Sequence, residues 1–151
     1  LFQNLKNYMN NILIRLGKNI KNLVILDTGA IKDSDCEEFA KVFPDRYFCF
    51  GLAESNMISA AAGFAIAGKL PLIFGNARFL LSRAFDEIYN DICLPNLNVK
   101  IVGCGQADVD KELVKILPNM SVTEGDLSML DRIVQEYGPA YLKKDDEHVK
   151  L

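Results

Sequence analysis

The sequence predicts a single α/β domain of the doubly wound kind, with helices covering both faces of a six-stranded, mostly parallel sheet in three layers. Short apolar runs alternate along the chain with segments of helical periodicity, an order typical of βαβ units. Most of these runs are apolar at consecutive positions, as expected for parallel strands that are buried on both faces. The length of 151 residues corresponds to about one domain.

Six strands are predicted at these runs, which are rich in Val, Ile, Leu and aromatic residues. The first, Leu23-Val24-Ile25-Leu26, is typical of a buried strand. The six predicted strands are residues 23–26, 47–52, 70–74, 99–102, 120–122 and 140–142.

The helices of the N-terminal half have start and stop signals. Apolar residues from Leu5 to Leu16 recur at helical spacing, and Gly17 is a stop signal. After the first strand, Ser34 or Asp35 can cap a second helix, which Pro44 ends.

A third helix is predicted over residues 55–67, which are rich in small side chains. Small residues such as those of Ala60–Gly68 let a helix approach its neighbour closely. Two interpretations stay open: tight packing within the domain, or a seam between subunits.

The C-terminal half carries similar signals. A long helix is predicted over residues 77–92, and Pro118 ends a short helix over 111–117. Asp126 caps a last helix, and Gly138-Pro139 follows it. The predicted domain is residues 1–144, and the charged residues 145–151 form a tail or a truncated linker.

The charge balance argues against several classes of partner. Seventeen basic and twenty acidic residues leave a net charge of −3, so we expect no nucleic-acid partner. No apolar run has the length needed to span a bilayer, and we expect no membrane partner.

Cysteine and histidine usage narrows the chemistry further. The four cysteines, at positions 36, 49, 93 and 104, form no CxxC pair, so neither a zinc ribbon nor a redox dithiol is predicted, and no metal site is expected. We expect buried free thiols and a cytoplasmic location. The only histidine, His148, lies in the charged tail, which leaves no basis for a Ser-His-Asp triad.

Ligands of parallel sheets bind outside the carboxyl ends of the strands, so the strand-to-helix turns are the places to search. Gly103-x-Gly105 follows a strand and has some likeness to a dinucleotide loop, but Asp108 stands where a third glycine or alanine belongs. The match is weak, and a plain tight turn is the favoured explanation of these glycines.

Glu54 follows the second strand directly and opens a helix. One interpretation is an acid stabilised by the helix dipole. The other is a carboxyl in an apolar site that shares a proton with a ligand nitrogen.

Phe79 and Arg83 lie four residues apart, on one face of the next helix, and Phe85 follows them. An aromatic ring and a guanidinium at the end of a strand could stack on a flat ligand and grip it. The other interpretation is core packing for the rings and a surface salt bridge for Arg83.

Several segments, in order, resemble one family. They are Phe39-Ala40-x-x-Phe43-Pro44-Asp45-Arg46-Tyr47-Phe48, Gly51-Leu52-Ala53-Glu54-Ser55-Asn56-Met57, Phe79-Leu80-x-x-Arg83-Ala84-Phe85-Asp86 and Gly138-Pro139-Ala140-Tyr141-Leu142. The chain resembles the pyrimidine-binding domain of transketolases, above all the C-terminal chain of split transketolases. It resembles deoxyxylulose phosphate synthase more distantly.

The resemblance implies a thiamine diphosphate-binding fold of the pyrimidine-domain type. It implies thiamine diphosphate as cofactor, shared with a partner chain that holds the diphosphate and Mg through a GDG…N motif, in a homo- or hetero-oligomer. Glu54 matches the glutamate that hydrogen-bonds the pyrimidine ring, and Phe79 the aromatic that stacks on it. Arg83 and Phe85 match neighbours in that helix, and Asp27 matches an acid at the end of the first strand.

The implied activity is ketol transfer between sugar phosphates, performed only together with the partner chain. The alternative is a non-catalytic relative that uses the domain for assembly or for binding a small ligand. Three features differ from the family pattern. Asn76 replaces a second aromatic residue, the region after Gly103 is shortened and lacks the substrate-side histidine, and Gly125-Asp126-Leu127 is only a helix cap.

Overall fold

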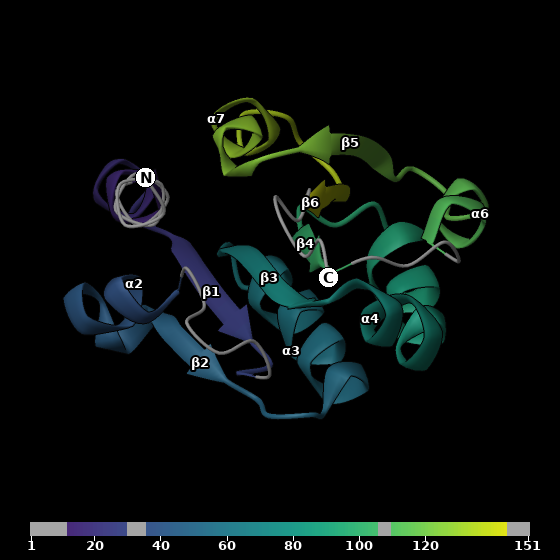
Figure 1. Cartoon of the computed structure of the whole chain (residues 1–151), viewed down its shortest axis with the longest axis horizontal. Coiled ribbons are helices and arrows are strands. Elements are labelled where there is room, and N and C mark those ends of the chain that lie inside the picture. Colours follow the sequence, from purple (N-terminus) through teal and green to yellow (C-terminus); the bar gives the residue numbers. More distant parts are fainter. Residues whose placement is uncertain (1–11, 30–35, 106–109, 145–151) are drawn as a thin grey trace, which may run out of the picture.

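The centre of the molecule is a six-stranded sheet in which every pair of neighbouring strands is parallel (Figure 1). The structure, a computed structural model, describes residues 12–29, 36–105 and 110–144. The strand order is β2-β1-β3-β4-β6-β5, which confirms the predicted doubly wound α/β class. The strands are β1 (Leu23–Asp27), β2 (Tyr47–Cys49), β3 (Leu70–Asn76), β4 (Lys100–Cys104), β5 (Ser121–Gly125) and β6 (Ala140–Lys144).

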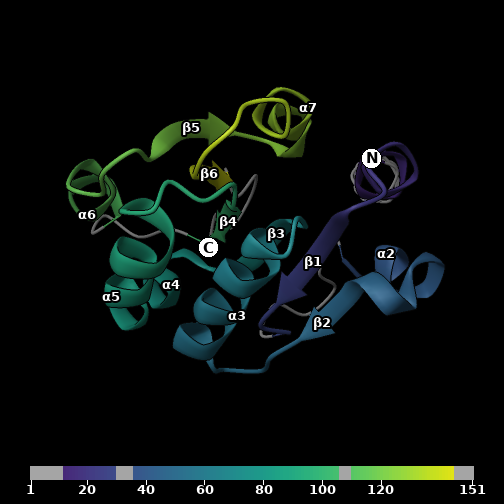
Figure 2. The ribbon, with the colours of Figure 1, turned by 180° about the vertical axis from the view of Figure 1, so that it is seen from behind.

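Helices form the two outer layers, as Figures 1 and 2 show from opposite sides. A helix over residues 12–19 precedes β1. The other α-helices are α2 (Glu37–Val42), α3 (Glu54–Ile66), α4 (Ala77–Arg83), α5 (Phe85–Glu87), α6 (Asp110–Lys115) and α7 (Leu130–Ile133). Three further helical segments are η1 (Pro44–Arg46), the π-helical η2 (Ile88–Cys93) and η3 (Leu127–Met129).

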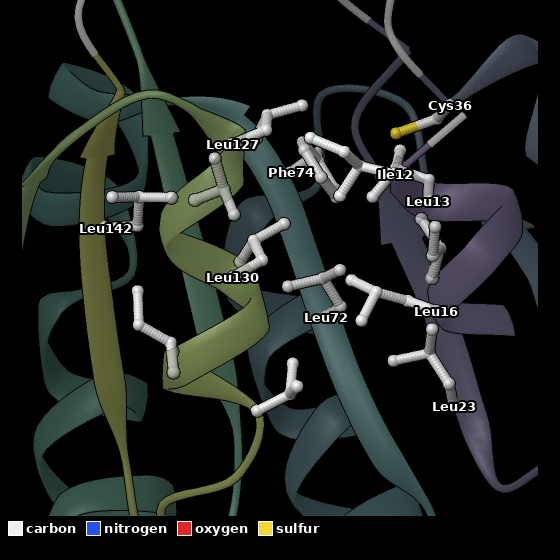
Figure 3. Close-up of a cluster of buried hydrophobic side chains, with 14 of the residues drawn as sticks. Ile12, Leu13, Leu16, Leu23, Cys36, Leu72, Phe74, Leu127, Leu130 and Leu142 are labelled. Carbon is white, nitrogen blue, oxygen red and sulfur yellow. The ribbon is translucent and has the colours of Figure 1, made fainter. Parts of the chain in front are cut away.

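One hydrophobic core lies between the sheet and the layer that contains helix 12–19, α2 and α7 (Figure 3). Leu13 and Leu16 of the first helix and Leu130 of α7 pack with Leu72 of β3. Arg15 and Asp131 join the two helices at the surface through an ion pair of 2.7 Å. The first and last helices of the described chain thus cover the sheet together.

A second core lies on the opposite face, where α3, α4, α5, η2 and α6 pack. Met57 and Ile58 of α3 and Leu80 of α4 are buried with Ile73 and Ile101 of the sheet. Burial on both faces is confirmed for β1, β3 and β4. The prediction of burial on both faces is wrong for β5, whose Val122 is 52% exposed. The reason is that β5 is an edge strand.

The predicted long helix over residues 77–92 is wrong as a single element. The helix breaks at Ala84, which has φ −118° and ψ 24°. The Ser55 hydroxyl donates to the carbonyl oxygen of Arg83 at 3.0 Å, and a side chain that takes a helical carbonyl interrupts the helical ladder. The chain then continues as α5 and the π-helical η2.

Gly103 has a packing role in β4. A Cβ at this position would lie 2.7 Å from Cζ of Tyr141 on β6 and would overlap its hydroxyl. The lack of a side chain at position 103 is therefore required by close packing within the sheet.

Four expectations fall wholly or partly on other parts of the chain. Outside the described residues lie residues 5–11 of the predicted first helix, the predicted caps Ser34 and Asp35, residues 106–109 of the region expected to be shortened, and the predicted tail 145–151. Cys36, Cys93 and Cys104 are buried, as expected, but Cys49 is exposed at the end of β2. Within the described ranges, no helix is long and apolar enough to cross a bilayer.

Candidate functional site

The site is built at the carboxyl edge of the sheet, beside the switch point of its topology. From β1 the chain first adds β2 on one side and then β3 on the other. Asp27 at the end of β1 is in register with Cys49 of β2 and Phe74 of β3. Ligands of open parallel sheets bind at such an edge.

Glu54 is the first residue of α3, and its side chain is only 3% exposed. The loop before it turns at Gly51, whose φ of +65° favours glycine. The amide of Phe50 donates to the carbonyl of Asp27 at 2.9 Å and ties this loop to β1. The turn ends the strand after Cys49 and sets the start of α3.

Arg83 joins Glu54 to Phe79. Its Nη1 lies 3.6 Å from Oε2 of Glu54, and its Cζ lies 4.0 Å from the centroid of the Phe79 ring. The Arg83 side chain is 50% exposed, while Phe79 is half-buried. The structure therefore brings together three of the five residues predicted for the site.

Two residues that sequence reasoning did not assign to the site hold this arrangement. Ser55 binds the carbonyl of Arg83 through its hydroxyl. Asn76 caps α4, and its Oδ1 accepts from the amide of Phe79 at 3.3 Å. An Asn directly before a helix is a recognisable capping signal, but the resemblance presented Asn76 only as a missing aromatic residue.

Asp27 lies at the same edge of the sheet with its carboxylate turned to other partners. It is 1% exposed, and its oxygens accept from the amide of Gly29 and the hydroxyl of Tyr47, each at 3.0 Å. Burial and the neighbouring Asp27 charge raise the pKa of Tyr47 above its usual range. These contacts link β1 to β2 and to the following turn.

Phe85 lies beyond the helix break and packs into the second core. Its ring centroid is 6.3 Å from that of Tyr89, one turn later. The ring contact of Phe85 is thus with Tyr89, whereas Phe79 contacts Arg83.

The side chains of Glu54 and Phe79 provide complementary recognition groups. A buried carboxylate accepts hydrogen bonds, and a half-buried aromatic face accepts a flat ring or a cation. In residues 12–29, 36–105 and 110–144, no group of three or more His, Cys, Asp or Glu side chains is placed to hold a metal ion. The carboxylate suits the edge of a flat nitrogen heterocycle, and the aromatic ring suits its face.

Comparison with known proteins gives the family. Residues 3–107 match the family described as transketolase, pyrimidine binding domain. The chain belongs to this family. The family includes this domain of transketolases and of 1-deoxy-D-xylulose-5-phosphate synthases, enzymes that depend on thiamine diphosphate.

Two curated relatives illustrate the range of this pyrimidine-binding family. A Methanocaldococcus jannaschii protein named as a transketolase C-terminal section is 36% identical over 148 residues, which cover 87% of this chain and 47% of the relative. The 1-deoxy-D-xylulose-5-phosphate synthase of Desulfotalea psychrophila is 36% identical over 89 residues, 59% of this chain and 14% of that enzyme. The chain thus spans about half the length of the first relative and a small part of the second.

Solved structures of the family have the same fold. A chain titled as a split gene transketolase, inactive beta4 tetramer, matches with a TM-score of 0.81 and 35% identity, over 90% of this chain and 49% of that chain. Transketolase from Campylobacter jejuni matches with a TM-score of 0.77 and 15% identity, over 92% of this chain and 25% of that chain. At that identity the second match concerns the fold alone.

Proposed function

We propose that this chain supplies the aminopyrimidine half of a thiamine diphosphate site in a transketolase-like enzyme that transfers a two-carbon ketol unit between sugar phosphates. The observation that carries the proposal is the buried Glu54 carboxylate at the start of α3, beside the half-buried ring of Phe79. The resemblance of both residues to the family pattern supports their assignment.

The residues fit an aminopyrimidine in the chemistry of their donors and acceptors. Glu54 offers a carboxyl group that is almost withdrawn from water, and it can hold or release a proton at an oxygen facing a ring nitrogen. Phe79 offers a flat apolar face for stacking. Arg83 is the last residue of α4, Phe85 begins α5 after the break at Ala84, and Asp27 supports the turn at the end of β1.

The proposed role of Glu54 is to exchange a proton with the aminopyrimidine ring. The chemistry that the bound cofactor supplies is a nucleophilic carbon for attack on a ketose carbonyl. With the cofactor bound, Glu54 would share a proton with a ring nitrogen. Ser55 holds the backbone of Arg83 beside α3, so that Glu54 and Phe79 keep their relative positions.

A partner chain completes the proposed site. Half of a cofactor site does not assemble a catalytic centre, so we propose that another chain carries the diphosphate and Mg through a GDG…N motif. The similar split transketolase, whose beta4 tetramer is titled as inactive, supports a chain that needs such a partner.

The test uses the tagged chain expressed in its own cells, with the co-purifying chains identified by mass. We expect a chain bearing GDG…N, an assembly that binds thiamine diphosphate with Mg, and ketol transfer from a panel of ketose phosphates. Glu54→Gln keeps the shape of the side chain and removes its acid function, so activity is expected to fall about 100-fold or more.

The control is Glu112→Gln, which changes an exposed glutamate that pairs with Lys115 on α6 and is expected to leave activity unchanged. Glu54→Gln with full activity would contradict the role of Glu54. An assembly without a GDG…N chain and without thiamine diphosphate binding would contradict the proposed function as a whole.

A further inference from the structure

The guanidinium of Arg83 contacts both groups that the proposed function assigns to the cofactor ring. Nη1 lies 3.6 Å from the Glu54 carboxylate, and Cζ lies 4.0 Å from the centre of the Phe79 ring. A single flat cation therefore pairs with the carboxylate and covers one face of the aromatic ring at the same time.

A ligand ring with the same two contacts needs the same space. The guanidinium lies over one face of the Phe79 ring and beside the Glu54 carboxylate, where such a ligand ring would have to lie. Guanidinium and an aminopyrimidine share a flat shape and N–H donors at the edge. We propose that Arg83 is an internal occupant of the half-site, which the aminopyrimidine displaces on binding; this inference rests on the proposed function.

The structure makes this displacement easy. The Arg83 side chain is 50% exposed, so it can move into water. Its backbone carbonyl stays bound to the Ser55 hydroxyl, and the helix need not move with the guanidinium. Water reaches the Arg83 end of the ion pair and weakens it by screening, although the Glu54 end is buried, and the stacking on Phe79 adds a modest attraction.

Arg83 also compensates the charge of Glu54 in the absence of the ligand. Glu54 is buried, and an uncompensated buried charge is costly. Arg83 supplies the opposite charge and covers the Phe79 ring until the cofactor takes both contacts. The cost is a lower apparent affinity for the cofactor, because only the fraction of molecules with Arg83 displaced is competent to bind.

The test measures the affinity of the assembly for thiamine diphosphate with Mg by titration calorimetry. Arg83→Met keeps a long side chain but removes the charge and the flat group. We expect it to bind about three- to tenfold more tightly than the wild type. Arg83→Lys keeps the charge without the flat stacking group, so its affinity is expected to lie between the two.

The matched control is Arg78→Met, an exposed arginine of the same helix, which is expected to leave the affinity unchanged. Circular dichroism spectra like that of the wild type establish that none of the variants alters the fold.

The outcomes separate this inference from the proposed function. Tighter binding by Arg83→Met with unchanged binding by Arg78→Met supports the internal occupant, as does binding by Arg83→Met where the wild type binds too weakly to measure. A wild type that binds, together with an Arg83→Met variant of equal or weaker affinity, overturns the occupant and leaves the proposed function standing. No binding by either protein overturns both.

Discussion

At the scale of single residues, the candidate site centres on one guanidinium that contacts both a buried carboxylate and an aromatic ring. Glu54 had two interpretations, and its 3% exposure differs from that of a solvated acid stabilised only by a helix dipole. Arg83 does form the salt bridge expected of a surface arginine. The contact of one guanidinium with both Glu54 and Phe79 was not predictable, because it joins residues of two helices, α3 and α4, and spacing within one helix carries no information on the other.

Asn76 gives a prediction at this scale. Its side chain caps α4 through the amide of Phe79, so Asn76→Ala leaves a helical N–H without its partner. We expect the free energy of unfolding, measured with urea, to fall by about 1 kcal/mol. The affinity of the assembly for thiamine diphosphate is expected to fall as well, because the cap orients the segment that carries Phe79.

Asn76→Ser is the control, since serine is also a good capping residue. It is expected to retain most of the stability and the affinity. Equal losses in the serine and alanine variants would mean that Asn76 acts through something other than the cap.

At the scale of elements, the predicted order of strands and helices is confirmed, while several boundaries moved for identifiable reasons. The predicted strand 47–52 ends at Cys49 because the chain turns at Gly51. The small-residue run of α3 divides: Ala61 and Ala62 are buried, as tight packing requires, but a Cβ on Gly63 would meet nothing within 4 Å. Periodicity alone does not distinguish these two faces.

Arg46 carries a prediction about how elements are joined. Its Nη2 donates to the carbonyl of Gly17 at 2.8 Å, and its Nη1 donates to the carbonyls of Ile20 and Lys21 at 3.2 Å. Its Cζ lies 4.0 Å from the centre of the Phe43 ring. Arg46 thus closes the end of helix 12–19 against α2 and η1.

Arg46→Ala is expected to lower the free energy of unfolding by about 2–3 kcal/mol, measured with urea, because it removes charged hydrogen bonds and a stacked cation. Arg46→Lys is expected to recover only part of the loss, since lysine lacks the planar fork. The exposed Arg78 provides the control, and Arg78→Ala is expected to change stability by less than about 0.5 kcal/mol. A decrease in unfolding free energy for Arg46→Ala no larger than that for the control would show that the contacts of Arg46 contribute little to stability.

At the scale of the whole molecule, the sequence predicted the layers but not the order of strands across the sheet. Pairs such as β1 with β3 and β4 with β6 are not consecutive in the chain, and periodicity carries no information on long-range pairing. The resemblance to a known family implied a fold of the pyrimidine-domain type, and the structure supplies the order β2-β1-β3-β4-β6-β5.

Stability of the whole fold should depend on Lys100, which is 1% exposed at the start of β4. Its Nζ donates to the carbonyls of Glu136 and Gly138, each at 2.7 Å. Burial lowers the pKa of Lys100 from 10.5 to about 8, against the opposing influence of the Glu136 charge. Between these two pH values the unfolded chain holds a proton that the folded chain has lost.

Folding is therefore favoured as the pH rises from about 8 to 10.5, by up to about 1 kcal/mol per pH unit. Burial raises the pKa of Cys93 to about 12, which has the opposite effect above pH 9, because the unfolded chain then loses a proton that the fold retains. Lys100→Met removes only the first contribution. We expect the difference in unfolding free energy between wild type and Lys100→Met, measured with urea under reducing conditions, to grow in favour of the wild type from pH 8 to 10. Since Cys93 is present in both proteins, its contribution cancels in that difference, and a difference that stays constant with pH would mean that Lys100 remains charged in the fold.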